Sequence, residues 1–329
     1  MPRLTAICPT RNEGPFVVEW VAWYRMLGFT DLLILTNDCT DRSPDLLDRF
    51  ADVGWVTHVT HRPHKGKPPK RSAYRTALAH PLAQKADWIF LCDIDEFLVI
   101  HQGDGTVAPF LDGREALCRC LAVHWRCFGT SGHAAWEDVP TPYRFTRAGP
   151  DRNAADASFK SFTYRPSGFQ KLSDHSPILF DGDWGKRPNV MVDTEGRVLP
   201  RFHPTDHHQR ATSRDRITHK SAQLNHYITR SVEHFEAKRG TPCASRHFDR
   251  YTDTFFETYN RNEVEDRSTL RYREQFDALR AEAMAIPGVA RLHHLCCADH
   301  IGWLCDRSGR DPEADPRRAY HLDRAAALA

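Results

Sequence analysis

Between residues 4 and 92 the chain alternates short apolar runs with segments of helical spacing, and this alternation limits the folds open to it. The apolar runs span residues 4–8, 31–35, 55–59 and 88–92. Pro15 and the Ser43-Pro44 pair mark the starts of two intervening helices, and a third is expected over 72–80. The order predicts an α/β fold in which a doubly wound, largely parallel sheet has helices on both faces.

Polar residues follow each predicted strand. Ligands of a doubly wound sheet bind beyond the carboxyl ends of its strands, so these residues are expected on one rim. They are Arg11, Asn12 and Glu13 after the first strand, Asn37 and Asp38 after the second, residues 61–71 after the third, and Asp93 and Asp95 after the fourth.

The stretch "WIFLCDIDEFLVI" places Asp93, Asp95 and Glu96 inside a segment that should otherwise be core. Burying ionised carboxylates without partners costs several kcal/mol each, which predicts a counter-ion. In extended backbone, residues two apart face the same side about 6.5 Å from one another. Asp93 and Asp95 are therefore expected to face one site. Hard oxygen ligands suit Mn²⁺ or Mg²⁺, with a diphosphate completing the shell.

Composition and charge limit the classes of binding partner that the protein is expected to have. A formal charge of +2 gives no reason to expect nucleic acid. No apolar run reaches the roughly 18 to 20 residues of a bilayer span, and the N-terminus has no secretory pattern. The 10 scattered cysteines indicate reduced thiols in a cytoplasmic protein, with at most peripheral membrane contact. Without a Cys-x-x-Cys pair, a structural zinc site is not expected.

Beyond residue 100 the pattern is weaker. "VHWRCFGTSGHAAWED" predicts a strand and a Gly-containing loop, and "AQLNHYI" predicts a short strand. Ser231 is expected to cap a helix that ends at Gly240. A further helix is predicted over 267–285, followed by a polar tail from about Ser308.

Several blocks resemble glycosyltransferase family 2, in the bacterial branch close to family 92. They are "ICPTRNEGPFVVEWVAWYRMLGF", "LILTNDCTDRSPDLL", "IFLCDIDEFLVI", "FGTSGH", "KSFTYRP" and "NHYITRSVEHFEAKR". The resemblance implies a GT-A fold, a nucleotide-sugar donor, a divalent metal and inverting chemistry. It places the glycosyltransferase domain at 1–240, with a nucleotide-binding half at about 1–100 and an acceptor half at about 101–240. Residues 241–329 are expected to form a mainly helical extension.

The resemblance also implies residue roles. Asp95 would be the direct metal ligand, and Asp93 would lie near the ribose or a metal-bound water. Asn37-Asp38 departs from the commoner acidic pair, but Asp38 can still reach the nucleobase or ribose. Arg11, Asn12 and Glu13 would line the nucleotide pocket, although Glu13 could instead be a first-turn helix charge.

His226 is the predicted third metal ligand, because a residue from the C-terminal side of the sheet often completes the shell in this fold; His175 is its rival. Tyr227, Ser231 and Lys238 beside it would bind the diphosphate. Lys160 and Lys171 are alternative phosphate partners. The basic loop "HRPHKGKPPKR" is either a solvated loop or a wall for the anionic donor, reached by Lys65 or Arg71.

The acceptor side is less defined. Inverting transfer needs a base near the acceptor hydroxyl, and Asp183 and His133 are the first candidates, with Asp138 and Asp181 behind them. Sugar-stacking aromatic residues would be Trp136, Tyr143 and Trp184.

The predicted function is a metal-dependent inverting hexosyltransferase that moves a sugar, expected to come from a UDP-sugar, to a saccharide or lipid-linked acceptor in surface polysaccharide synthesis. Two alternatives stay open. One is a nucleotidyltransferase or metal phosphohydrolase on the same carboxylates. The other is a non-catalytic protein that binds a sugar nucleotide.

Overall fold

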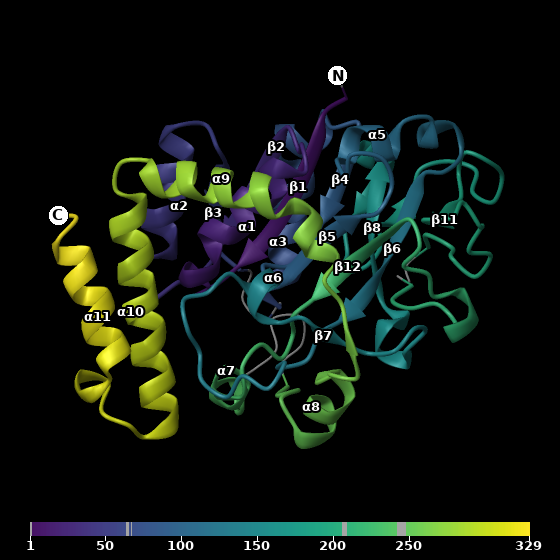
Figure 1. Ribbon diagram of the computed structural model, residues 1–329. Helices are drawn as coiled ribbons and strands as arrows, with labels where there is room; N and C mark the ends of the chain where they lie inside the picture. The colour runs from purple at the N-terminus through teal and green to yellow at the C-terminus, as the bar shows by residue number, and fades with distance from the viewer. Residues whose placement is uncertain (1, 64–65, 67, 206–208, 242–247) are drawn as a thin grey trace.

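The computed structural model describes residues 2–63, 66, 68–205, 209–241 and 248–329. A mixed sheet of nine strands forms its centre, in the order β3-β2-β1-β4-β8-β6-β12-β5, with β11 beside β6 (Figure 1). The strands are β1 (Leu4–Thr10), β2 (Asp31–Thr36), β3 (Thr57–Thr60), β4 (Trp88–Leu91), β5 (Glu96–Ile100), β6 (Cys120–Cys127), β8 (Phe159–Tyr164), β11 (Met191–Asp193) and β12 (Ala222–His226).

Shorter elements complete the chain. Two small antiparallel sheets pair β7 (Arg147–Ala148) with β13 (Val264–Glu265), and β9 (Phe169–Lys171) with β10 (Ile178–Phe180). The α-helices are α1 (Gly14–Met26), α2 (Ser43–Asp52), α3 (Pro69–Ala79), α4 (Pro81–Gln84), α5 (Val107–Leu111), α6 (Thr141–Arg144), α7 (Val232–Lys238), α8 (Asp253–Tyr259), α9 (Arg273–Ala285), α10 (Val289–Ser308) and α11 (Pro316–Ala326).

The predicted α/β class and largely parallel sheet are confirmed. β1 pairs in parallel with β2 and β4, and β2 with β3, as the alternation in the sequence requires. Within β1, Leu4, Ala6 and Cys8 face a core with residues of α1, α2, α9 and α10. Ile7 faces the opposite core, with residues of α3. The period of two therefore buries both faces of the sheet under helices.

The C-terminal half makes the sheet mixed. β8 runs antiparallel to both β4 and β6, whereas β12 is parallel to β6 and antiparallel to β5. β4, β6 and β12 therefore share one direction, so their carboxyl ends meet at the same edge of the sheet. This topology brings residues that follow β4 close to residues that end β12.

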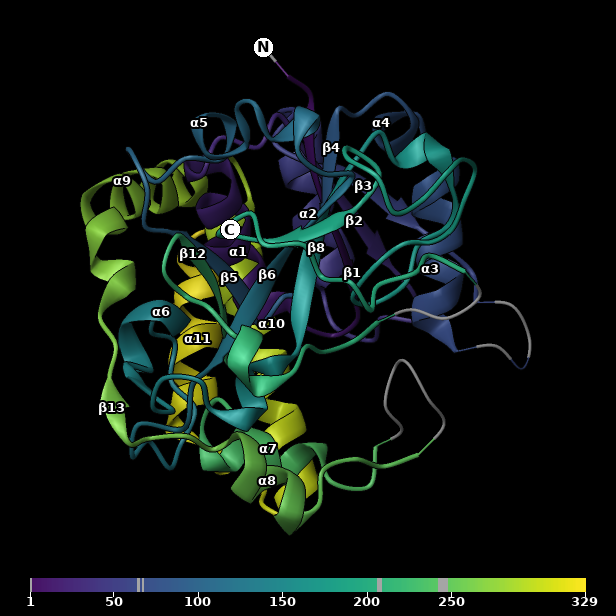
Figure 2. The same ribbon diagram turned by 90° about the vertical axis from the view of Figure 1, so that its right-hand side faces the viewer.

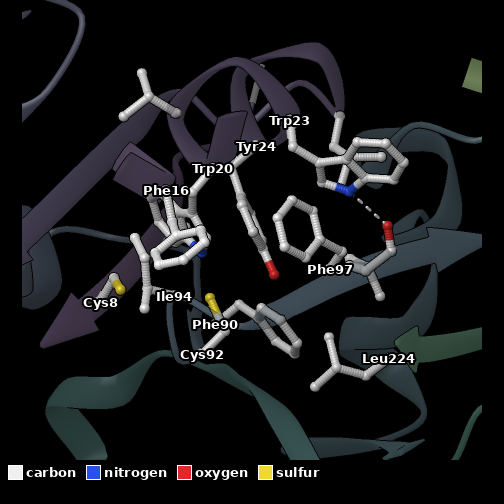
Figure 3. Packing of buried hydrophobic residues seen from close by; sticks show 14 of the residues in the cluster. Cys8, Phe16, Trp20, Trp23, Tyr24, Phe90, Cys92, Ile94, Phe97 and Leu224 are labelled. Atoms are coloured by element: carbon white, nitrogen blue, oxygen red, sulfur yellow. Dashed lines mark hydrogen bonds between the residues drawn. The ribbon is translucent and has the colours of Figure 1, made fainter. Parts of the chain in front are cut away.

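Aromatic side chains of α1 connect the core to that edge (Figure 3). Trp23 Nε1 donates a hydrogen bond to the carbonyl of Leu98 at 2.9 Å, and the Tyr24 hydroxyl donates to the carbonyl of Glu96 at 3.0 Å. Trp20 Nε1 reaches the carbonyl of Asp93 at 3.2 Å. One helix face thus fixes the connection between β4 and β5 through its buried polar atoms.

Some local predictions were wrong. Residues 93–95 form a turn between β4 and β5 and are not extended. The expected helix over 267–285 starts as a 3₁₀ turn, Ser268–Tyr272, before α9. The expected polar tail is a helix: Asp315 caps α11, Pro316 begins it, and His321 and Ala325 are buried. That capping signal outweighs the low hydrophobicity of the segment.

The C-terminal extension is helical, as predicted. Figure 1 shows α10 and α11 side by side, with α10 also contacting α1, α2 and α7. Viewed from the side, α7 and α8 lie together at one end of the molecule (Figure 2). The domain boundary at residue 240 stays a prediction. No helix among the described residues is long and apolar enough to cross a membrane.

Candidate functional site

An open cleft of about 1600 Å³ lies beyond the carboxyl ends of β1, β2, β4 and β12. The loop after β1 contributes Arg11, Asn12 and Glu13, and β2 is followed by Asn37. The turn after β4 contributes Asp93 and Asp95, and β12 ends in His226. α8 and α10 line the cleft opposite the sheet, so residues of the C-terminal extension form part of its wall.

The turn that carries Asp93 and Asp95 is held from both sides. The carboxylate of Glu96, which is fully buried at the start of β5, accepts the backbone N–H of Asp93 at 2.8 Å. The backbone N–H of Tyr227 donates to the carbonyl of Asp95 at 2.9 Å. The backbone of the turn from which both aspartate side chains extend is therefore fixed by hydrogen bonds.

Asp93 has counter-ions within the protein. Its carboxylate lies 2.6 Å from the Lys70 ammonium and 3.1 Å from that of Lys160, which is only 1% exposed. Burial tends to raise the pKa of Asp93, but the two ammonium groups outweigh it and hold the pKa below its usual value. The sequence predicted a counter-ion for these carboxylates and favoured a metal; for Asp93 the structure places two lysines of the chain in that position.

Glu96 is in a different electrostatic state. Burial raises its pKa to about 7, even though Lys160 lies 3.6 Å from its carboxylate. Lys160 is shared between Asp93 and Glu96, and the two acids repel one another. The site therefore keeps Asp93 ionised and brings the titration of Glu96 close to neutral pH.

Asp95 and His226 form the pair best suited to a metal. His226 Nε2 lies 3.7 Å from Asp95 Oδ2, too far for a hydrogen bond. Adjacent ligands of an octahedral ion with bonds of about 2.1 Å are separated by about 3 Å, so a small closure places both on one ion. Burial tends to raise the pKa of Asp95, but His226 and the cations Arg230 and Lys238 hold it well below its usual value.

The ring of His226 is oriented by its surroundings. It packs at 4.2 Å between ring centroids against Trp125, and only 3% of its surface is exposed. Within the described chain its Nδ1 atom has no hydrogen-bond partner. The ionised carboxylate suits Mn²⁺ or Mg²⁺, and the buried imidazole beside it can add a nitrogen ligand.

Glu13 joins the cleft to α7. Its carboxylate lies 2.7 Å from Arg230 and 3.2 Å from Lys238. Burial opposes ionisation, yet these cations lower the pKa of Glu13. Arg230 also lies over the ring of Phe16, at 3.4 Å from its centroid. Glu13 makes no side-chain cap to α1, so its carboxylate positions cations instead of capping the helix.

His175, Lys160 and Lys238 also reach the cleft. His175 Nδ1 contacts the carbonyl of Phe159 at 2.8 Å, and burial lowers the pKa of this histidine to about 3. It therefore stays neutral and lies on the side of the cleft formed by β8. Lys171, the other predicted phosphate partner, is exposed on β9 and does not line the cleft as described.

Other predicted nucleotide and diphosphate residues lie elsewhere. Tyr227 packs its ring against Phe97 and Phe128, and its hydroxyl accepts the amide of Asn225. Ser231 accepts the N–H of His234 and caps α7, as predicted from its helix pattern. Both side chains are therefore occupied by structural contacts. Asp38 and Arg71 are exposed and absent from the described cleft lining, and Lys65 falls outside the described residues.

The predicted acceptor-side residues are not brought to the described part of the cleft lining. Asp183 and Asp181 are exposed in the loop after β10, and His133 Nε2 contacts the carbonyl of Arg144. Asp138 contacts His293.

The three aromatic residues proposed to stack on sugars also have packing contacts. Trp136 packs against His300, and the Tyr143 hydroxyl bonds to Asp277. Trp184 packs against Phe202.

The sequence interpretation missed several residues of the cleft. Lys70 is adjacent to Arg71 in the predicted basic loop, and the residue types alone did not indicate which of the two cations reaches the cleft. Arg230 precedes the recognised cap Ser231. The aromatic residues of the opposite wall are Phe248, Tyr251, Phe255, Tyr259 and Trp303. They lie in the region after 240, for which the sequence offered only helix signals.

The solved structures that resemble this chain are distant from it in sequence. Residues 1–349 of S. aureus TarS align over 99% of this chain and 90% of that one, at 11% identity and a TM-score of 0.36. The same fragment in complex with UDP-GlcNAc gives 12% identity and a TM-score of 0.33, with 99% and 90% coverage. Glucosyl-3-phosphoglycerate synthase from Mycobacterium tuberculosis aligns over 38% of this chain and 44% of that one, at 18% identity and a TM-score of 0.26.

No curated protein matches the sequence significantly. The model of glycosyltransferase family 92, in contrast, matches residues 4–276, which include every strand and all of the cleft residues that the sheet carries. The match runs through the turn of Asp93 and Asp95 and through His226. The chain therefore belongs to glycosyltransferase family 92 and is a glycosyltransferase.

Proposed function

We propose that this glycosyltransferase transfers a hexose, with inversion, from a UDP-sugar to a saccharide or lipid-linked acceptor. The observation that carries the proposal is the meeting of Asp95 and His226, 3.7 Å apart, at the edge of the sheet where the cleft opens. A carboxylate and an imidazole at that position are suited to a divalent ion that a diphosphate can share.

The nucleoside would bind over the ends of β1 and β2. Arg11 and Asn12 line the cleft there, and the Asn12 side chain contacts Thr40 through both its amide nitrogen and its oxygen. Asn37 is 6% exposed and also lines the cleft. These groups offer hydrogen bonds to a base and a ribose, with Asp38 at the margin.

Cations on the other side of Asp95 suit the diphosphate. Lys238 lines the cleft. The Glu13 carboxylate lies within 3.2 Å of both the Lys238 ammonium and the Arg230 guanidinium. An ammonium group that is already in position stabilises the negative charge that develops on the departing nucleoside diphosphate, because the site does not have to reorganise during the reaction. Arg210, which also lines the cleft, adds to the positive field that attracts an anionic donor.

The site fits Mn²⁺ or Mg²⁺ at Asp95 and His226, with Asp93 turned toward its lysines. When bound, such an ion neutralises charge on the leaving diphosphate and lowers the barrier to its departure. In this arrangement the Asp93 carboxylate forms ion pairs with Lys70 and Lys160, and its backbone orients the turn. Glu96 supports the same turn from beneath.

The acceptor would approach the wall formed by α8 and α10. Phe255 and Tyr259 are neighbours on α8 with ring centroids 4.6 Å apart, and Trp303 of α10 also lines the cleft. Flat aromatic faces pack against the C–H groups of sugar rings. A saccharide or the glycan head of a lipid-linked acceptor suits this wall. A role in surface polysaccharide synthesis at the inner face of the membrane stays a prediction.

A donor screen tests the proposal. Nucleoside diphosphate release is measured for a panel of UDP-, GDP- and dTDP-sugars with Mn²⁺, with and without a panel of oligosaccharides, alongside thermal shift. The expected result is stabilisation by one donor class and release that rises when an acceptor is added. Release that never depends on an acceptor would favour a phosphohydrolase, and donor binding without turnover would favour a non-catalytic protein.

A further inference from the structure

A second group of potential metal ligands lies away from the cleft, between the helical extension and the rest of the chain. α10 contributes His293, His294 and Cys297, and α11 contributes His321. The loop before α6 contributes Asp138, which the sequence had offered as a possible base. Figure 1 shows that α10 and α11 lie side by side, so their facing residues can share one ion.

In the first half of the group, the potential ligand atoms of three residues lie close together around His293. Its Nε2 atom lies 3.1 Å from each carboxylate oxygen of Asp138 and 3.6 Å from the sulfur of Cys297. His293 and Cys297 are four residues apart, so they project from one face of α10. The potential ligand atoms of Asp138, His293 and Cys297 all lie within 4.8 Å of one another.

The second half faces the same carboxylate. His294 Nδ1 lies 2.9 Å from His321 Nδ1, and both rings have ligand atoms within 4.8 Å of Asp138. His294 and His321 are both buried, and imidazole nitrogen is a common ligand of borderline-soft divalent ions.

Hydrogen bonds among the described residues do not satisfy every buried polar atom of this group. His293 is 1% exposed, and within the described chain its Nδ1 atom has no hydrogen-bond partner. Cys297 is fully buried, whereas Asp138 keeps 23% of its side chain exposed and opens the group to solvent. An ion could enter past Asp138 and find nitrogen and sulfur ligands behind it.

We propose that this group binds Zn²⁺ or a similar borderline-soft divalent ion. Asp138, His293 and Cys297 provide three ligands, and the His294–His321 pair provides the fourth. Tetrahedral zinc with bonds of about 2.0 to 2.3 Å separates its ligands by about 3.3 to 3.8 Å, close to the separations of 3.1 and 3.6 Å around His293. The ion would tie α10 and α11 to the loop before α6. No Cys-x-x-Cys pair marks the site, because its ligands come from three separate elements.

Cobalt binding tests the thiolate. The full-length chain is freed of metal with a chelator and titrated with Co²⁺, and the near-ultraviolet band of a cobalt–thiolate bond is recorded. We expect the band to saturate near one equivalent, to disappear in Cys297→Ser and to remain in the matched variant Cys296→Ser, whose sulfur lies against Gly14. The same band in all three proteins, or none in any of them, would overturn the proposal.

Zinc binding tests the other ligands without using activity. Stoichiometry is measured by elemental analysis and the melting temperature is followed with and without Zn²⁺. The wild type and Asp95→Ala should both retain the ion and be stabilised by it, since the cleft is a separate site. His293→Ala and the double variant His294→Ala/His321→Ala should bind it at least roughly 10-fold more weakly. Retention by both histidine variants, or loss in Asp95→Ala, would show that the ion belongs elsewhere.

Discussion

The backbone N–H of Tyr227 donates to the carbonyl oxygen of Asp95 at 2.9 Å. This bond joins the end of β12 to the turn between β4 and β5, so His226 and Asp95 cannot move independently. The ring of Tyr227 meanwhile packs in the core and fixes the backbone that makes the contact. The contribution of Tyr227 to the site is thus made by its main chain.

Asp95→Ala should abolish Mn²⁺-dependent transfer while the fold is retained. The substitution removes a carboxylate that is held ionised at the cleft, and comparable electrostatic losses cost roughly 3 to 4 kcal/mol in transition-state stabilisation. Turnover is measured by nucleoside diphosphate release at saturating donor. The matched control is Asp52→Asn, an exposed carboxylate at the end of α2. Near-normal turnover in Asp95→Ala would refute the metal assignment.

His226→Ala should weaken nucleoside diphosphate binding in the presence of Mn²⁺ and change metal-free nucleoside binding little. The reason is that the imidazole faces Asp95, whereas His175 lies against the carbonyl of Phe159. Calorimetric titration of both alanine variants, with and without Mn²⁺, measures the effect. If His175→Ala shows the larger metal-dependent loss, the two ligand assignments must be exchanged.

Lys160→Met should destabilise the fold by about 3 kcal/mol. The ammonium is 1% exposed between Asp93 and Glu96, and removal of one member of a buried ion pair leaves uncompensated charge. Urea unfolding measures the free energy. Lys171→Met, exposed on β9, is the control and should stay within about 0.5 kcal/mol of the wild type. Equal stability of the two variants would contradict the buried network.

The free energy of unfolding should fall as pH rises, because the buried Glu96 carboxyl loses its proton. Its pKa is raised from 4.5 to about 7 in the fold, so the folded state binds more protons than the unfolded state between these values. That contribution is present at pH 4 and is lost as pH passes 7.

Glu96→Gln removes this dependence. Relative to the wild type, the variant should gain roughly 2 to 3 kcal/mol between pH 5 and pH 8, measured by urea unfolding at both values. The exposed control Glu282→Gln on α9 should show no such change. A pH-independent difference between wild type and Glu96→Gln would show that the acid does not titrate in this range.

The sequence by itself determined the local elements and the rim of the sheet. Apolar alternation predicted β1, β2 and β4, and the Ser231 cap predicted α7, because these patterns act between residues close in sequence. The order of strands then placed Asp95 at an edge where ligands bind. Family resemblance added His226, which the topology brings beside it.

Only the tertiary structure decided which charges meet. Asp93 and Lys160 are 67 residues apart, and Glu13 and Arg230 are 217 apart, so no local pattern records either pair. The same holds for Asp138 and His293, which lie 155 residues apart and meet where α10 packs against the loop before α6. Electrostatic energy depends on distance and burial in space, whereas sequence patterns report neighbours along the chain. The partners of the buried charges therefore became visible only once the sheet and its helices were packed.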